Sequence, residues 1–256
     1  MGNLLKMDLY RMTKAKSFWV CLGIAFALAL LQTPFAWGIS LVARMFTTET
    51  VEFPKTALLS DIIADPFPLL NGMLCLLSAC AFFYADVENG YIKNIAGQMP
   101  RRGFTILSKF MAAIPHTLLF MLAGIIGNLI GTVIFQQITA DGEILNSVLS
   151  FLMKLLLLQS ICAIMLLVTS SFQNKSLGTV LAVLMGLGLL YVVYSMIDSG
   201  INQIWKNKGF AVADYMPDQL LGRPKPPVLD SILVSAVTTA IFLPLSIRVF
   251  DRRDVK

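Results

Sequence analysis

Charged residues are scarce in this sequence, and their scarcity excludes most water-soluble folds. Only 14% of the 256 residues are Asp, Glu, Lys or Arg, whereas 57% belong to the hydrophobic set. A soluble domain of this length needs a surface on which roughly 25 to 35% of the side chains are charged, and a surface facing lipid needs almost none. We therefore expect most of the protein surface to face a bilayer.

Histidine is too rare, and cysteine too scattered along the sequence, to form the usual metal sites or disulfide-type CxxC motifs. The single histidine, His116, excludes multi-histidine metal sites and speaks against an intramembrane metalloprotease. It follows Pro115 inside an apolar run, which favours a packing or capping role. The four cysteines also lie in apolar segments and form no CxxC pair, so we expect them to pack as small hydrophobic side chains: Cys21, Cys75, Cys80 and Cys162.

Catalytic motifs are missing as well. The chain lacks the phosphate-binding pattern GxxxxGK[ST], and it lacks the paired acids and multiple histidines expected of a prenyl-protease-like intramembrane hydrolase. We expect no catalytic residue, no metal and no cofactor in this chain. The net charge of +5 comes from short basic clusters between apolar runs rather than from one patch, which argues against nucleic-acid binding.

Long apolar runs dominate the rest of the chain. About 20 apolar residues in a helix cross the hydrocarbon core of a bilayer. We identify six such runs, and no repeat or linker divides them, so the sequence predicts an all-α polytopic membrane protein with a single domain over 1–256. The predicted spans cover approximately residues 17–41, 62–85, 110–135, 145–171, 177–197 and 229–250.

The basic residues predict the orientation of these spans. With six spans, four segments of the chain lie on the same side of the membrane: the N-terminal segment, the segment 86–109, the link near Asn174 and the C-terminal tail. Together they contain 13 of the 20 Lys and Arg residues. Basic residues favour the cytoplasmic side, so both termini are expected in the cytoplasm. The segment 199–228 carries four basic residues and counts against this orientation.

The N-terminal segment 1–16 is predicted to be an amphipathic helix at the inner membrane surface. Leu4, Leu5, Leu9 and Met12 fall on one side of the helix, and Asp8 interrupts that side. A frayed beginning of the first span is the alternative interpretation.

The segment 86–109 is the longest predicted cytoplasmic stretch. Asn89-Gly90 permits a turn, Tyr91, Ile92 and Ile95 fit one face of a short helix, and Gly97 and Pro100 end it. Such a helix suits docking to another protein. A plain solvated loop is the alternative.

Three stretches of the chain resemble the permeases of ATP-binding-cassette type-2 transporters. In segment 86–109 the matching positions are Asp86 or Glu88, Gly90, Ile92-Lys93-Asn94, Arg101 or Arg102, and Ser108-Lys109. The opening stretch from Leu5 to Trp19 and the closing stretch from Phe250 to Asp254 also look like that family.

The resemblance implies where the permease would meet its ATPase. The cytoplasmic loop would act as a coupling helix that sits in a groove of a separate ATPase subunit, and the N-terminal helix would dock as well. The segment 199–228 would be an extracellular or re-entrant loop, or its aromatics would only mark a membrane interface. The implied ATPase contacts are Tyr91, Ile92, Lys93, Asn94 and Ile95, with Leu5, Leu9 and Met12 as weaker candidates.

The resemblance also implies the partners. The ATPase dimer would bind ATP and Mg²⁺, and a second copy or a homologous permease would complete the transporter in a bacterial cytoplasmic membrane. Gly127 and Gly131 form a small-xxx-small pair that could serve such a contact, as could Gly186 and Gly188, and packing within one chain is equally compatible.

The resemblance further implies an amphipathic or hydrophobic substrate, as for family members that export antimicrobial peptides and give bacteriocin immunity. Polar residues within spans are candidates for the pathway because lipid exposure would be costly, and they are Asn128, Lys154 and Gln159. Lys154 is expected to extend its amine toward water from near the end of its span. A membrane adaptor or sensor that transports nothing remains the alternative.

Overall fold

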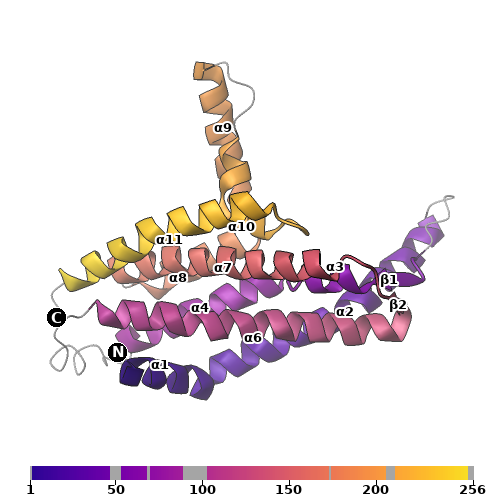
Figure 1. Cartoon of the computed structure of the whole chain (residues 1–256), viewed down its shortest axis with the longest axis horizontal. Helices are drawn as coiled ribbons and strands as arrows, with labels where there is room; N and C mark the ends of the chain where they lie inside the picture. The colour runs from indigo at the N-terminus through magenta and orange to yellow at the C-terminus, as the bar shows by residue number, and fades with distance from the viewer. Residues whose placement is uncertain are drawn as a thin grey trace.

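The computed structural model is a bundle of long helices and describes residues 2–46, 53–67, 70–88, 103–172, 174–205 and 211–252 (Figure 1). In chain order its elements are α1 (Gly2–Lys14), α2 (Lys16–Phe46), β1 (Thr56–Leu58), α3 (Leu59–Ala64), α4 (Asn71–Glu88), α6 (Phe104–Phe135), β2 (Gln137–Thr139), α7 (Ile144–Phe172), α8 (Lys175–Gly186), α9 (Tyr191–Trp205), η1 (Val212–Tyr215), α10 (Pro217–Leu221) and α11 (Val228–Asp251).

Four helices of the described chain are long and apolar enough to cross a membrane. They are α2, α6, α7 and α11, and they confirm the first, third, fourth and sixth predicted spans. Helix α6 begins at Phe104, earlier than the predicted residue 110, because the residues before the apolar run are also helical. The protein is therefore a multi-pass membrane protein.

The second predicted span, 62–85, is wrong as a single helix. Helix α3 ends at Ala64, and α4 begins only at Asn71. Pro66 disfavours helical geometry at the residue before it, and Asp65 has φ −115° and ψ 77°, outside the helical region. The apolar part of α4, Asn71–Asp86, is shorter than the other spans.

The fifth predicted span, 177–197, is broken. Helices α8 and α9 meet at an angle of 74°, and together they count as one span at most, which brings the total in the described residues to five. Gly188 has a φ of 66°, a conformation that glycine adopts without strain, and it lies at this elbow. Helix α9 projects away from the bundle (Figure 1).

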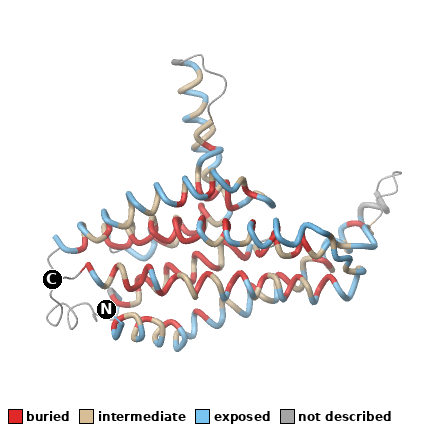
Figure 2. Tube along the Cα trace, viewed as in Figure 1, coloured by how far each residue is buried: buried red, intermediate tan, exposed pale blue. Residues whose placement is uncertain are grey.

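The bundle core lies around α7. Helix α2 packs along α6, α11 packs along α7, and α4 packs against α8. Leu157, Leu158 and Ile161 of α7 are completely buried. Large hydrophobic side chains such as Phe35 and Val133 are exposed on the outside, as expected for a surface that lipid covers, and buried residues gather between the helices (Figure 2).

The glycines of α6 pack against α2 of the same chain. A Cβ atom built on Gly127 would lie 2.7 Å from the carbonyl oxygen of Phe26, and one on Gly131 would collide with the backbone of Leu30. Gly186 of α8 is similarly close to the backbone of Met73. The small-xxx-small pair therefore serves packing within one chain, the second of the two alternatives that the sequence left open.

Both termini lie at the same end of the bundle (Figure 1). At the other end β1 and β2 pair in parallel, with Thr56 opposite Gln137 and Leu58 opposite Thr139, so the all-α expectation needs a small correction. The cytoplasmic location of the termini stays a prediction.

Candidate functional site: an ion-pair network at the end that carries both termini

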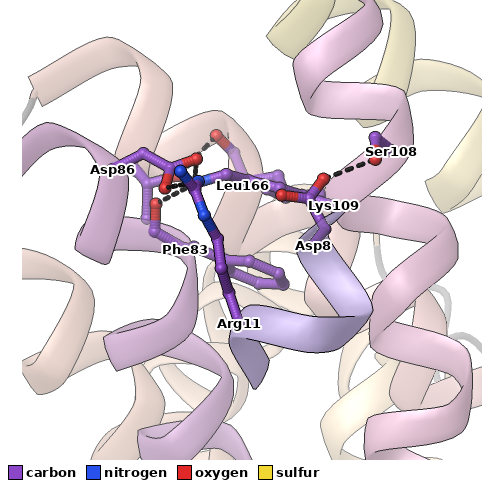
Figure 3. A network of polar contacts seen from close by, with 8 residues as sticks. Asp8, Arg11, Phe83, Asp86, Ser108, Lys109 and Leu166 are labelled. Carbon is purple, nitrogen blue, oxygen red and sulfur yellow. Dashed lines mark hydrogen bonds and ion pairs between the residues drawn. The ribbon is translucent and has the colours of Figure 1, made fainter. Parts of the chain in front are cut away.

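Asp86 lies between two basic side chains at the end of α4. One carboxylate oxygen, Oδ1, accepts a hydrogen bond of 2.8 Å from Arg11 of α1, and the other, Oδ2, lies 3.1 Å from Nζ of Lys109 of α6 (Figure 3). The side chains of Asp86 and Lys109 are only 12% and 7% exposed. One carboxylate therefore joins three helices.

Lys109 is held by α4 in two further ways. Its Nζ donates a hydrogen bond of 2.6 Å to the carbonyl oxygen of Phe83, and it lies 5.9 Å from the centre of the Phe82 ring. These contacts compensate for the loss of water around a buried ammonium group.

Asp8 adds a direct contact between α1 and α6 to the network. It is buried, and its Oδ2 accepts a short hydrogen bond from the hydroxyl of Ser108, next to Lys109 (Figure 3). Burial raises the pKa of Asp8 above its ordinary value, while Ser108 and Lys109 oppose that shift. The residue that interrupts the apolar side of α1 in the sequence is therefore part of its buried face, together with Leu4 and Met12.

A separate contact fixes the first described residue after segment 89–102. The backbone N–H of Gly103 donates a hydrogen bond of 2.6 Å to Oδ1 of Asp251, at the end of α11. A Cβ atom on Gly103 would lie 2.5 Å from the side chain of Ile247, so α6 begins in close contact with α11. The helices on both sides of segment 89–102 are thus attached to other parts of the bundle.

The four charged groups of this network balance one another. Two carboxylates, Asp8 and Asp86, lie beside two cations, Arg11 and Lys109, so the cluster is neutral when all four are ionised. We call these four residues and Ser108 the terminal network. The groups contact one another and so connect α1, α4 and α6.

The variant Asp8→Asn should become more stable, relative to the wild type, as the pH rises above about 3.8. Asparagine keeps an oxygen that can accept the hydrogen bond from Ser108. Because burial raises the folded-state pKa of Asp8 above 3.8, stability from this carboxyl is fully present below 3.8 and is lost as the pH rises through the folded pKa. Parallel unfolding measurements of both proteins in detergent across this range test the sign, and a difference that does not change with pH would contradict it.

The predicted ATPase contacts divide into two groups. Tyr91 to Ile95 lie outside the described residues, so that prediction stays open. Of the weaker candidates, Met12 is buried in the core at 2% exposure, while Leu5 and Leu9 are half-buried. Met12 therefore has almost no surface to offer a partner in this conformation.

The three predicted pathway residues each make a polar contact of their own within the bundle, and their role in a pathway stays a prediction. The Oδ1 atom of Asn128 accepts a hydrogen bond of 3.4 Å from Thr132 within α6, and Nε2 of Gln159 donates one of 2.7 Å to the carbonyl oxygen of Phe110. The expectation that Lys154 reaches water is wrong. It is 1% exposed, because its Nζ turns to Asp65 at 3.0 Å.

His116 packs as expected. It is fully buried, its ring lies 5.4 Å from that of Phe18 and 5.0 Å from that of Phe120, and its Nε2 is 3.1 Å from the hydroxyl of Ser78. It joins α2, α4 and α6 just inside the terminal network.

The sequence analysis missed that the residues of the terminal network contact one another. Asp86, Ser108 and Lys109 stood out only as motif positions. The available signal was that Asp86 lies at the end of one apolar run and Lys109 at the beginning of the next, since such charges at a membrane boundary need partners.

No known protein family matches this chain in a comparison with family models, and a comparison with curated proteins also finds no match.

Proposed function

We propose that this protein is the membrane permease subunit of an ATP-driven exporter of the ATP-binding-cassette type-2 class, in a bacterial cytoplasmic membrane. Its cargo would be amphipathic or hydrophobic molecules, with antimicrobial peptides as the first class to test. The observation that carries the proposal is the terminal network, which fastens α1 to the two helices that precede and follow segment 89–102.

This arrangement suits the transmission of force from a partner. An ATPase that held Tyr91 to Ile95 would pull on the end of α4 and the beginning of α6, and Asp86 links those two helices through Lys109. Arg11 and Asp8 would carry the same displacement to α1, and Asp251 would carry it to α11. Closure of the ATPase would then move this end of the bundle as one unit.

A photocrosslinking amino acid placed at Tyr91 tests the proposed docking. We expect it to capture a nucleotide-binding subunit in native membranes, whereas the same group at Gly142, in the link before α7 at the opposite end, should not. ATP hydrolysis by the captured subunit should rise when the permease is present. Capture of no nucleotide-binding protein at Tyr91 would overturn the proposal.

The same experiment distinguishes an exporter from the alternative function, a membrane adaptor or sensor. A membrane adaptor or sensor would yield a captured partner that binds no nucleotide, or an ATPase whose activity stays unchanged while no peptide moves across vesicles. Transport of a labelled antimicrobial peptide into inside-out vesicles, dependent on ATP, is the result expected of an exporter.

A further inference from the structure

A large cavity lies beside the elbow between α8 and α9, away from the terminal network. Its volume is about 680 Å³, within the range of small-molecule sites. The lining comes from the link between α3 and α4, the elbow itself, η1 and α10. The elbow is attached to α10 because Nε2 of Gln219 donates a hydrogen bond of 3.1 Å to the carbonyl oxygen of Gly188.

Two of the three carboxylates in the cavity lining already have a cation. Asp65 is paired with Lys154 at 3.0 Å, and Asp214 is paired with Arg223 at 2.5 Å. Each of these ion pairs has no net charge. They leave the third carboxylate, Asp218, as the excess negative charge of the cavity.

Asp218 is buried, and its side-chain donors in the described structure are neutral. Its Oδ1 accepts a hydrogen bond of 3.2 Å from the hydroxyl of Tyr194, and its Oδ2 accepts one of 2.9 Å from Nε2 of Gln219. The residue is 3% exposed. Burial raises the pKa of Asp218, because the ionised form has lost its water, and a cation in the cavity would restore that stabilisation.

We propose that this cavity binds a molecule carrying a primary ammonium or guanidinium group, with the Asp218 carboxylate as its counter-ion. Phe67, Met185 and Leu221 add apolar surface to the same lining and suit the hydrocarbon part of such a molecule. A carboxylate and an ammonium group form a charge-assisted hydrogen bond, which is stronger than a neutral one.

The donors fit an organic cation better than a metal ion. Calcium takes six to eight oxygen ligands, and magnesium requires near-octahedral geometry. Among the described residues no group of three His, Cys, Asp or Glu side chains is placed to hold a metal. The binding site also goes beyond the proposed function, since it requires neither an ATPase nor transport.

Dansylcadaverine, which joins a fluorescent aromatic group to a primary amine, is a suitable probe. We expect its fluorescence to rise on binding to the full-length protein in nanodiscs of phosphatidylcholine, after subtraction of empty nanodiscs. N-acetyl-dansylcadaverine has the same aromatic part without the charge, and we expect it to bind at least about tenfold more weakly. Equal binding of the two probes overturns the proposal without any variant being needed.

Two variants locate the site. Asp218→Asn should weaken dansylcadaverine binding at least about tenfold, because it removes the charge and keeps the shape. Glu143→Gln changes an exposed carboxylate that pairs with Lys225 outside the cavity, and it should have no effect.

The outcomes of this series are clear. Loss of binding in Asp218→Asn alone supports the proposal. Unchanged binding in Asp218→Asn, equal loss in Glu143→Gln, or displacement of the probe by micromolar Ca²⁺ or Mg²⁺ overturns it. Because the assay contains neither ATP nor a partner subunit, its failure would leave the proposed exporter function to be judged by the photocrosslinking experiment.

Discussion

Replacement of Asp86 by alanine is expected to lower the free energy of unfolding by about 3 kcal/mol. The variant leaves Lys109, whose side chain is 7% exposed, without its counter-charge, and it also releases Arg11 of α1. Removing one partner of a buried ion pair costs about 3 to 5 kcal/mol, and the lower value applies because Arg11 is 26% exposed. Unfolding in mixed detergent micelles, followed by circular dichroism, measures the change.

Glu88→Ala is the matched control, since Glu88 lies on the same helix and also forms an ion pair. Its partner is Lys175 at 2.9 Å, with side chains 60% and 53% exposed, so the expected loss is below about 1 kcal/mol. The double variant Asp86→Asn with Lys109→Met should recover part of the loss, because it removes both charges. Equal destabilisation by Asp86→Ala and Glu88→Ala would contradict the prediction, because it would show that burial of the ion pair does not increase the loss of unfolding free energy.

Alanine at both Gly127 and Gly131 is expected to destabilise the protein by about 3 kcal/mol or more. Each new methyl group would meet the backbone of α2, at Phe26 and Leu30, which cannot move without displacing the whole helix. The expected result is therefore a separation of α2 from α6, measured as a lower unfolding free energy in micelles.

Gly23→Ala and Gly38→Ala provide the control on α2. A Cβ atom at either position would meet nothing within 4 Å, so these variants should be neutral or slightly stabilising through better helix propensity. If the glycines of α6 instead joined two copies of the chain, the double variant would lose self-association and keep its unfolding free energy. That result would contradict packing within one chain.

Much of the fold follows from the apolar runs alone. Four of the six predicted spans are long helices, because a run of about 20 apolar residues has few alternatives to a helix in lipid. Run length alone did not reveal the break at Asp65 or the elbow at Gly188. Asp65 and Pro66 interrupt the apolar stretch at the first break, whereas Gly188 lies inside a continuous apolar stretch and is marked only by its positive φ.

The site was less predictable than the spans. Motif similarity directed attention to Asp86 and Lys109, but their contact and the contribution of Arg11 depend on which helices become neighbours. The case of Lys154 is similar. Its distance from the span end suggested water as the partner, whereas the position of α3 offered Asp65.

The sequence by itself determined that this is an integral membrane protein, because too few charges are present to cover a water-facing surface. It also determined that charges gather near the ends of the spans, where water is close. Only the tertiary structure decided which of those charges face one another and that Asp218, whose side-chain donors among the described residues are neutral, lines a cavity at the elbow. Such pairings depend on distances across helices, and no spacing along the chain encodes them directly.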